Sequence, residues 1–431
     1  MSVTTQRRKP RNDRVTAAFE RRRAPGQDLV QAADTIATVC ADLAERFRRG
    51  GTLYTFGNGG PSTDAQHVSV EFVHPVIVGK RALPAHSLVS DAATVLGVAG
   101  RTGLDEVFAH QIGVLAQPDD IALGISADGD DANVLRGLER AREVGALTVA
   151  LLGSDGGAIA RSGMADHVLR VASPDPHVVK EVHVTVYHLL WELTHAFLEQ
   201  DAGATTSVHE QVGSGLDGLY PFLYGGAGDG DRLRVEVARS SAGKAADIVA
   251  LRDAMADVHG DALLAAADDL APLYARRGKL LACGNGGSSA DAQAVVQSFL
   301  DPSLGTARPL AALCLTSDVA VITALSNDVD FSVVFARQVR SFGRAGDALV
   351  GLSTSGNSPN VMEAFAAARA LGMVTIGFAG NDGGAMARSD AIDHLFVVPS
   401  SSVHRIQETQ TTLYHVLLEL TQEALAPPVA D

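Results

Sequence analysis

The stretch Leu352-Ser353-Thr354-Ser355-Gly356-Asn357-Ser358-Pro359-Asn360 decides how the chain around it folds. The sequence predicts an apolar strand over 347–351 before it and a helix over 361–371 after it. Its hydroxyl groups and unpaired backbone N–H groups therefore gather at a helix N-terminus, which is an arrangement that binds anions. Four hydroxyl groups within six residues suit the phosphate of a small molecule. The alternative is an ordinary strand–helix loop in which Ser358 alone caps the helix.

The chain contains the same domain twice. Gly57-Asn58-Gly59-Gly60 recurs as Gly284-Asn285-Gly286-Gly287, so the numbering of the two copies differs by a constant offset, 284 − 57 = 227. One offset that holds from Gly57 to His188 indicates a duplicated domain with almost no insertions. The other landmarks that this offset relates are Ser90-Asp91 and Ser317-Asp318, Asp155-Gly156-Gly157 and Asp382-Gly383-Gly384, and Tyr187-His188 and Tyr414-His415.

Short apolar strands alternate with helical segments in both copies. This pattern predicts an α/β fold with two tandem doubly wound parallel sheets, each covered on both faces as a flavodoxin-like three-layer sandwich. Ligands of such sheets bind beyond the carboxyl ends of the strands, where 57–60 and 353–358 are expected to lie. The predicted strands are 52–56, 85–89, 121–125, 147–152 and 167–171 in the first copy, and 279–283, 310–315, 348–352, 374–378 and 394–398 in the second.

The predicted domain bounds follow from composition. Residues 1–24 form a basic N-terminal arm, which we expect to be solvated and partly disordered, with docking onto an acidic partner surface as the alternative. The Gly-, Asp- and Ser-rich segment 201–235 is interpreted as a linker. The first domain is predicted at 25–200, the second at 236–426, and a tail at 427–431.

Composition restricts the partners. The 431 residues carry a formal net charge of −15, which argues against nucleic acid as the main partner because phosphate backbones require a basic surface. No apolar run approaches the roughly 18 residues of a membrane span, so we expect no membrane partner. Three cysteines without metal-type spacing are typical of a reducing compartment, and the protein is expected to be cytoplasmic.

The second copy resembles a known family. Its Gly284-Asn285-Gly286-Gly287-Ser288-Ser289-Ala290-Asp291-Ala292-Gln293 is similar to the sugar isomerase (SIS) domain of phosphoheptose isomerases, as are Ser317-Asp318, Asn327-Asp328, 353–358, Asp382-Gly383-Gly384 and Arg405-Ile406-Gln407-Glu408. The resemblance implies an aldose–ketose isomerase that converts sedoheptulose 7-phosphate to D-glycero-D-manno-heptose 7-phosphate, often with zinc. Family members usually carry one domain per chain and assemble as tetramers. A fused pair therefore implies a homodimer that forms a pseudo-tetramer of SIS domains.

Neither copy holds the family's full catalytic and metal-binding set. That set is a His and a Glu four residues apart on the helix after the Gly-rich turn, and a Gln and a His eight residues apart on the terminal helix. The first copy has His67, Glu71 and His188, but at the Gln position it has Lys180, a cation that would repel a metal. In addition, three carboxylates in Ser126-Ala127-Asp128-Gly129-Asp130-Asp131 would repel a phosphate. The second copy has Gln407 and His415, but Ala294 and Ser298 replace the His and the Glu, and His404 stands where the family commonly has Asp.

Together the two copies supply one complete set, which suggests a composite site. We predict Glu71 and His415 as catalytic residues. The zinc ligands would be His67, Glu71, Gln407 and His415. The substrate-binding residues would be Asn285, Ser288, Asp318, Ser353, Thr354, Ser355, Ser358 and Gln407.

Three alternatives stay open. Zinc could be held within the first copy by His67, Glu71 and His188. Both copies could have lost catalysis and bind a phosphosugar or a protein partner. The chain could also isomerise another sugar phosphate in specialised metabolism.

Overall fold

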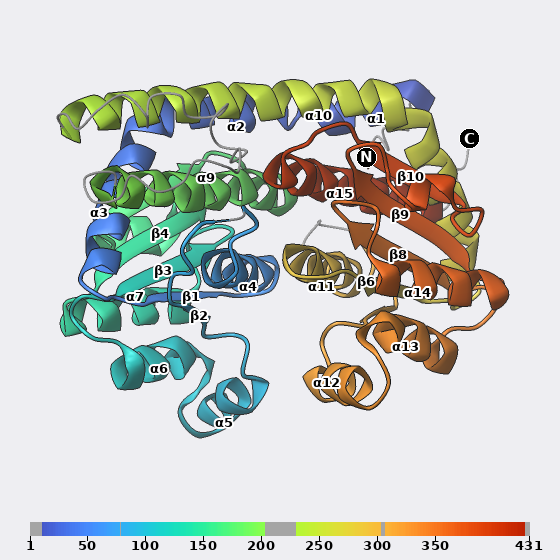
Figure 1. The fold of residues 1–431 in the computed structure, drawn as a ribbon, viewed down its shortest axis with the longest axis horizontal. Helices are drawn as coiled ribbons and strands as arrows, with labels where there is room; N and C mark the ends of the chain where they lie inside the picture. Colours follow the sequence, from blue (N-terminus) through green and yellow to red (C-terminus); the bar gives the residue numbers. More distant parts are fainter. Residues whose placement is uncertain (1–10, 78, 203–229, 303–306, 427–431) are drawn as a thin grey trace, which may run out of the picture. The chain divides into compact units, whose positions relative to one another are not determined.

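The computed structural model describes residues 11–77, 79–202, 230–302 and 307–426. They form two compact units: an N-terminal unit, Ala24–Asp247, and a C-terminal unit, Ile248–Asp431 together with Met1–Arg23. Figure 1 labels most of the helices and strands of both units. Most of the predicted linker (203–229) and the predicted tail (427–431) lie outside the described residues. The bounds of the two SIS domains remain predictions.

The N-terminal unit contains a five-stranded parallel sheet in the order β2-β1-β3-β4-β5, which is the flavodoxin-like order. Its strands are β1 (Leu53–Gly57), β2 (Ala85–Ser87), β3 (Ile121–Ser126), β4 (Leu147–Gly153) and β5 (His167–Val171). Its helices are α2 (Arg23–Asp28), α3 (Ala33–Arg48), α4 (Gly60–Val73), α5 (Ala92–Thr102), α6 (Val107–Leu115), α7 (Ala132–Val144), α8 (Gly157–Ser162) and α9 (Pro176–Ala202), with short 3-10 helices η1 (Leu29–Ala32) and η2 (Leu104–Glu106).

The C-terminal unit repeats this architecture. Its parallel sheet has the order β10-β9-β8-β6-β7, which is the same topology built from the equivalent strands of the second copy. Its strands are β6 (Leu280–Cys283), β7 (Ala312–Cys314), β8 (Ala348–Ser353), β9 (Val374–Gly380) and β10 (His394–Val398). Its helices are α11 (Gly287–Leu300), α12 (Val319–Asp328), α13 (Val334–Phe342), α14 (Pro359–Ala370) and α15 (Val403–Leu425), with η4 (Phe331–Val333) and η5 (Met386–Arg388).

Two apolar clusters cover the two faces of each sheet. In the N-terminal unit, Ile36, Phe72 and Trp191 from α3, α4 and α9 pack on one face, while Phe108 and Leu138 from α6 and α7 pack on the other. The C-terminal unit has the same two clusters. Buried on both faces, the strands are almost entirely apolar, as expected for parallel sheets. The predicted three-layer α/β fold is confirmed in both copies.

The helix that begins the chain, and the first part of the helix that begins the second copy, each pack in the unit that contains the other copy. Helix α1 (Arg11–Glu20) contributes Val15 and Phe19 to the apolar core of the C-terminal unit. The long helix α10 (Gly230–Ala275) begins in the N-terminal unit, where Val237 and Ala245 are buried, and continues in the C-terminal unit. Residues 236–247, which the sequence places in the second domain, therefore pack in the N-terminal unit.

The prediction of a solvated, partly disordered arm is wrong for residues 11–23. Arg14 forms an ion pair with Glu423 (Nε–Oε2, 2.5 Å), and Arg22, which is only 3% exposed, pairs with Glu419 (Nη2–Oε1, 2.8 Å). Both acceptors lie on α15, so this acidic helix end holds the basic segment against the C-terminal unit. Among the described helices, none combines the length and apolar character that a membrane crossing requires.

Candidate functional site

The hydroxyl loop, residues 353–358, joins the carboxyl end of β8 to the N-terminus of α14. The Oγ atoms of Ser353 and Ser358 lie 2.9 Å apart. Ser358 is the N-cap residue of α14, yet its side chain makes no capping hydrogen bond. The loop is therefore not the ordinary capped turn that the sequence allowed as an alternative. Two of its hydroxyl groups, those of Ser353 and Ser358, meet at a helix N-terminus, where a bound anion is favoured.

A second loop fixes the shape of the hydroxyl loop. Gly356 has a φ of +63°, and a Cβ there would lie 2.1 Å from the carbonyl oxygen of Gly383. Asn357 Oδ1 accepts a hydrogen bond from the backbone N–H of Ala385 (2.8 Å). The predicted residue Asn285 exchanges two side-chain hydrogen bonds, both 2.9 Å, with Asn360 at the start of α14. Asn360, which sequence reasoning did not single out, thus positions a candidate binding residue.

The other predicted binding residues of this unit lie at helix starts or on the loop. Ser288 is buried near the start of α11, next to the Gly-rich turn. Thr354 is half-buried and Ser355 is exposed. Asp318 caps α12 by accepting a hydrogen bond from the backbone N–H of Val321 (3.0 Å), so it has a structural role that does not depend on a ligand.

In the first copy the equivalent loop, residues 126–131, contains its own anion. Asp131 stands where the second copy has Ser358, and its carboxylate accepts hydrogen bonds from the hydroxyl of Ser126 and from Asn58 Nδ2 (2.6 Å). Ser126 is the equivalent of Ser353. The carboxylate of Asp131 thus uses the hydroxyl donor that a phosphate would need, and Asp128 and Asp130 add further negative charge. That this loop does not take a phosphate stays a prediction.

Three buried residues of the N-terminal unit form a potential metal-binding cluster. One ligand atom each from His67, Glu71 and His188 lies within 4.8 Å of the other two. His67 and Glu71 share one face of α4, with Nε2 and Oε1 3.5 Å apart, and His188 comes from α9. The hydroxyl of Tyr187 lies 2.9 Å from His67 Nδ1, so it orients the ring while Nε2 faces Glu71. Two imidazoles and one carboxylate are a ligand set that zinc accepts.

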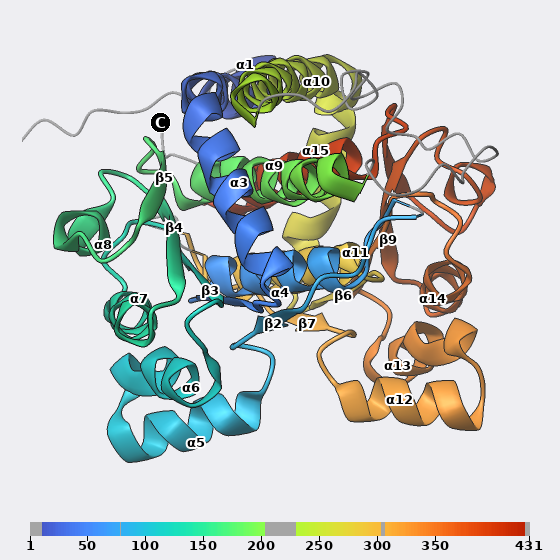
Figure 2. The same ribbon diagram turned by 60° about the vertical axis from the view of Figure 1, so that its left-hand side comes forward.

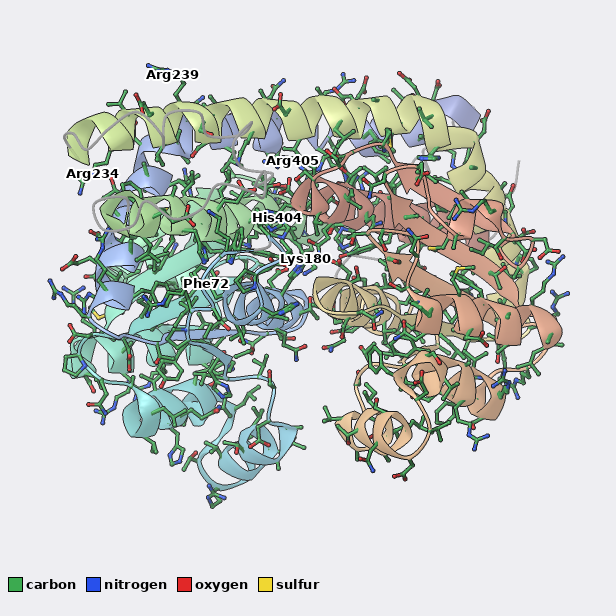
Figure 3. The ribbon with its side chains drawn as sticks, viewed as in Figure 1. Phe72, Lys180, Arg234, Arg239, His404 and Arg405 are labelled. Atoms are coloured by element: carbon green, nitrogen blue, oxygen red, sulfur yellow. The ribbon has the colours of Figure 1, made fainter. Side chains whose placement is uncertain are left out.

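Lys180 does not compete with this cluster. Its ammonium group forms an ion pair with Asp64 and donates to Thr63 Oγ1 (2.9 Å) and the carbonyl oxygen of Gly60 (3.3 Å). Figure 3 labels Lys180. Burial raises the pKa of Asp64, and the charge of Lys180 opposes that shift. The expectation that Lys180 would repel a metal is therefore weakened, because Asp64 neutralises the ammonium group at the start of α4.

The remaining members of the predicted composite site lie in the C-terminal unit. Gln407 and His415 are buried on α15. Ala294 and Ser298, which replace the family's His and Glu, are buried on α11. The hydroxyl loop is in this unit too, whereas the His67–Glu71–His188 cluster is in the other. A composite site therefore remains a prediction.

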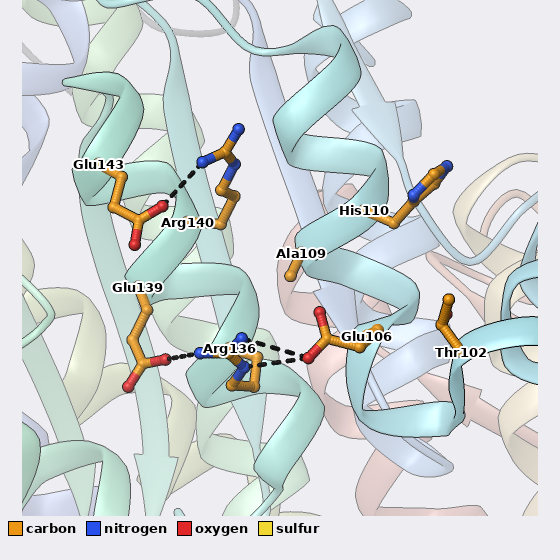
Figure 4. Close-up of a pocket in the computed structure, with 8 residues that line it drawn as sticks. All are labelled: Thr102, Glu106, Ala109, His110, Arg136, Glu139, Arg140 and Glu143. Atoms are coloured by element: carbon orange, nitrogen blue, oxygen red, sulfur yellow. Dashed lines mark hydrogen bonds and ion pairs between the residues drawn. The ribbon is translucent and has the colours of Figure 1, made fainter.

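A cavity elsewhere in the N-terminal unit contains none of the predicted site residues. It has a volume of about 300 Å³ and lies between α6 and α7 (Figure 4). Its arginines are occupied by neighbouring carboxylates: Arg136 pairs with Glu106 and Glu139, and Arg140 pairs with Glu143. These pairings leave the hydroxyl loop and the His67–Glu71–His188 cluster as the candidate functional groups.

Comparisons with known proteins agree with the duplicated fold. The family described as "SIS domain" matches residues 24–153 and 245–380, which together are more than half of the chain. A phosphoheptose isomerase of Desulfovibrio desulfuricans is 51% identical over 162 residues, which cover 37% of this chain and 76% of that protein. Another from Roseiflexus sp. is 44% identical over 163 residues, covering 38% of this chain and 82% of that protein.

One solved structure matches almost the whole chain. It is the C-terminal domain of glucosamine-fructose-6-phosphate aminotransferase from Francisella tularensis, with a TM-score of 0.58 and 9% identity over 94% of this chain and 96% of that one. At this identity the likeness concerns the fold alone. The two matched regions and the two phosphoheptose isomerases lead to the same assignment: the chain belongs to the SIS-domain family, as a tandem pair of domains related to the phosphoheptose isomerases.

Proposed function

We propose that this SIS-domain isomerase interconverts sedoheptulose 7-phosphate and D-glycero-D-manno-heptose 7-phosphate at a composite site of its two copies. The observation that carries the proposal is the division of functional groups between them. The second copy holds the uncapped hydroxyl loop, and the first holds the buried pair His67 and Glu71. The names of the curated relatives support a heptose phosphate as the substrate.

The hydroxyl loop would hold the phosphate end of the sugar. Ser353 and Ser358 offer adjacent hydroxyl groups at the N-terminus of α14, and Thr354, Ser355 and Ser288 would add donors. Asn285 and Asp318 would contact hydroxyl groups of the sugar chain. Binding energy from this remote end can then position C1 and C2 for reaction.

The isomerisation transfers one proton between carbons and one between oxygens. Glu71 would take the proton from C1 of the ketose and return it to C2, through an enediol. His415 would take the proton from O1 and deliver one to O2, so that the carbonyl group moves from C2 to C1. Gln407, eight residues before His415 on α15, would orient the sugar oxygens with its amide.

The residues of the N-terminal unit fit a zinc ion. His67, Glu71 and His188 would hold it, with Tyr187 fixing the first imidazole. When bound, zinc would polarise the sugar oxygens and stabilise negative charge on them. In the alternative set, Gln407 and His415 would replace His188. A carboxylate that binds metal is a weaker base, so the two sets assign different main roles to Glu71.

The first experiment is conversion of sedoheptulose 7-phosphate by the full chain in D2O, followed by NMR. We expect formation of the aldose with deuterium at C2, loss of turnover in Glu71→Gln, and retained binding of the sugar phosphate. Ser298→Ala, at the equivalent position of the second copy, is the matched control and should keep full turnover. A fully active Glu71→Gln variant would refute the proposed role. Binding of the sugar phosphate without any turnover would instead indicate a phosphosugar-binding protein.

We further propose that the protein is cytoplasmic and forms a homodimer, a pseudo-tetramer of SIS domains. Two chains would supply four such domains. Light scattering should then give twice the chain mass of 44.8 kDa.

A further inference from the structure

A cavity of about 330 Å³ opens beside the edge strand of the N-terminal unit, and it contains none of the residues assigned above. It lies between η1 and β5. Strand β5, which Figure 2 labels, is the outermost strand of its sheet. Buried Leu29, Leu169 and Val182 contribute to its apolar floor, and Asp28, Gln31 and Arg170 contribute to its exposed rim. An apolar cavity with a few polar groups is the usual form of a small-molecule site.

The second copy fills the equivalent space with its own side chains. At the offset that relates the two copies, His259 stands in place of Ala32 and Phe396 in place of Leu169. Likewise, Met255 replaces Asp28 and Leu413 replaces Val186, all four being buried. The first copy thus has a smaller side chain at each of these four positions. The difference is reversed at Leu29, Val182 and Arg170, whose equivalents are Ala256, Thr409 and Val397, but the four reductions together remove more volume than these three residues add.

His259 shows which kind of chemical group this space accepts in the second copy. Its ring meets Phe396 edge-on, with ring centres 5.5 Å apart and planes at 83°. His259 Nε2 lies 2.9 Å from the carbonyl oxygen of Val397 on β10. Burial lowers the pKa of His259, which favours the neutral ring, and one ring N–H is enough to donate to that carbonyl.

The carbonyl group that would accept this hydrogen bond recurs in the first copy. Arg170 is the equivalent of Val397, and the two have the same register: Arg170 pairs with Leu152, and Val397 pairs with Ala379, which is the equivalent of Leu152. Both strands are at the edge of their sheets, with a neighbour on one side only. The Arg170 carbonyl group therefore points out of the sheet, toward the space that the imidazole fills in the second copy.

We infer that this cavity binds a small neutral N-heteroaromatic compound of purine size, whose ring N–H donates to the carbonyl oxygen of Arg170. The ring would lie on Leu169 and Val182, as the imidazole of His259 lies against Phe396. A bicyclic ring fits better than imidazole alone, because several side chains besides the histidine are smaller here. Asp28 and Arg170 balance each other in charge on the rim, so neither sign of ligand is favoured. Cavities left by missing side chains bind apolar rings of matching shape.

Adenine is the probe that tests this inference. We expect calorimetry on the full chain to show one saturable site and a higher melting temperature in the presence of adenine. Ala32→His restores the side chain found in the second copy and should weaken adenine binding at least tenfold. The reverse change, His259→Ala, leaves Met255, Phe396 and Leu413 in place, so it should open a space for one additional imidazole per chain but not for a second adenine.

Leu169→Phe provides a second way of filling the cavity if Ala32→His does not fold, and it should weaken binding as well. Three results would overturn the inference: no saturable binding to the wild type at millimolar adenine, unchanged affinity in the filled variants, or no additional imidazole bound by His259→Ala. None of these measurements depends on isomerase turnover, so the inference stands or fails separately from the proposed function.

Discussion

At the scale of single residues, Ser358 and Asp131 occupy equivalent positions, and we propose that they determine whether each loop can hold a phosphate. Ser358→Asp should convert the hydroxyl loop into a copy of the first, because the new carboxylate would accept the hydrogen bond of Ser353 as Asp131 accepts that of Ser126. Repulsion between such charges is worth about 4 kcal/mol at ~4 Å near a protein surface, so phosphate-ester affinity should fall at least about 100-fold. Ser358→Ala, which removes only a hydroxyl group, should cost about tenfold. Equal losses in both variants, measured by calorimetry, would contradict this reading.

The Lys180–Asp64 ion pair gives a second prediction at the residue scale, which concerns the stability of the fold. Asp64 is 1% exposed, so Lys180→Met leaves a buried carboxylate without its cation and should destabilise the fold by about 3–5 kcal/mol at pH 8. Burial already raises the pKa of Asp64 above its ordinary value of 3.8, and loss of the cation raises it further. A carboxyl group whose pKa is raised in the folded state stabilises the fold at low pH, and this stability is lost as the pH rises through the folded-state pKa. The deficit should therefore shrink toward pH 5 in urea unfolding.

The double variant Asp64→Asn/Lys180→Met is the control for that experiment. It removes both charges and should recover most of the loss at pH 8. A deficit that does not change between pH 5 and pH 8 would show that lost packing, not the buried charge, is responsible.

At the scale of elements, the sequence pattern predicted the strands, because strand formation depends largely on residues that are close together in the chain. The strands His167–Val171 and His394–Val398 lie at their predicted bounds, whereas β2 is two residues shorter than predicted, since it pairs only with β1 and then leaves the sheet. The sequence pattern did not predict that α1 packs in the C-terminal unit and the first part of α10 in the N-terminal unit. Both helices present apolar faces, but which core each face joins depends on contacts between residues far apart in the chain.

The docking of α1 gives an element-scale prediction. Phe19 is 3% exposed in the core of the C-terminal unit, so Phe19→Ala should cost about 3–5 kcal/mol. Hydrogen exchange should accelerate in α15 and α10 of that unit, while β3 and β4 of the N-terminal unit keep their protection. Thr16→Ala, at an exposed position on the same helix, is the matched control and should change neither. Faster exchange in β3 and β4 instead would contradict the assignment of α1 to the C-terminal unit.

At the scale of the whole molecule, the sequence showed which candidate site residues each copy has, but not all of the side chains that contact them. The spacing of His67 and Glu71 on one helix face was readable from the sequence, and so was the replacement of the equivalent pair by Ala294 and Ser298. The hydrogen bond from Tyr187 to His67 and the Lys180–Asp64 pair arise because α9 packs against α4, a tertiary contact that spacing alone does not specify.

Zinc content can decide between the two ligand sets, because His188 belongs to one of them and His415 to the other. We expect about one zinc per chain after dialysis, measured by mass spectrometry of the metal. His188→Ala should lose it, since its ligand atom lies within 4.8 Å of those of His67 and Glu71. His415→Ala should keep the metal and lose turnover, as expected for a group that moves protons. His110→Ala, at an exposed position on α6, controls for nonspecific binding by histidine. The opposite result, zinc kept in His188→Ala and lost in His415→Ala, would assign the metal to the composite set of His67, Glu71, Gln407 and His415.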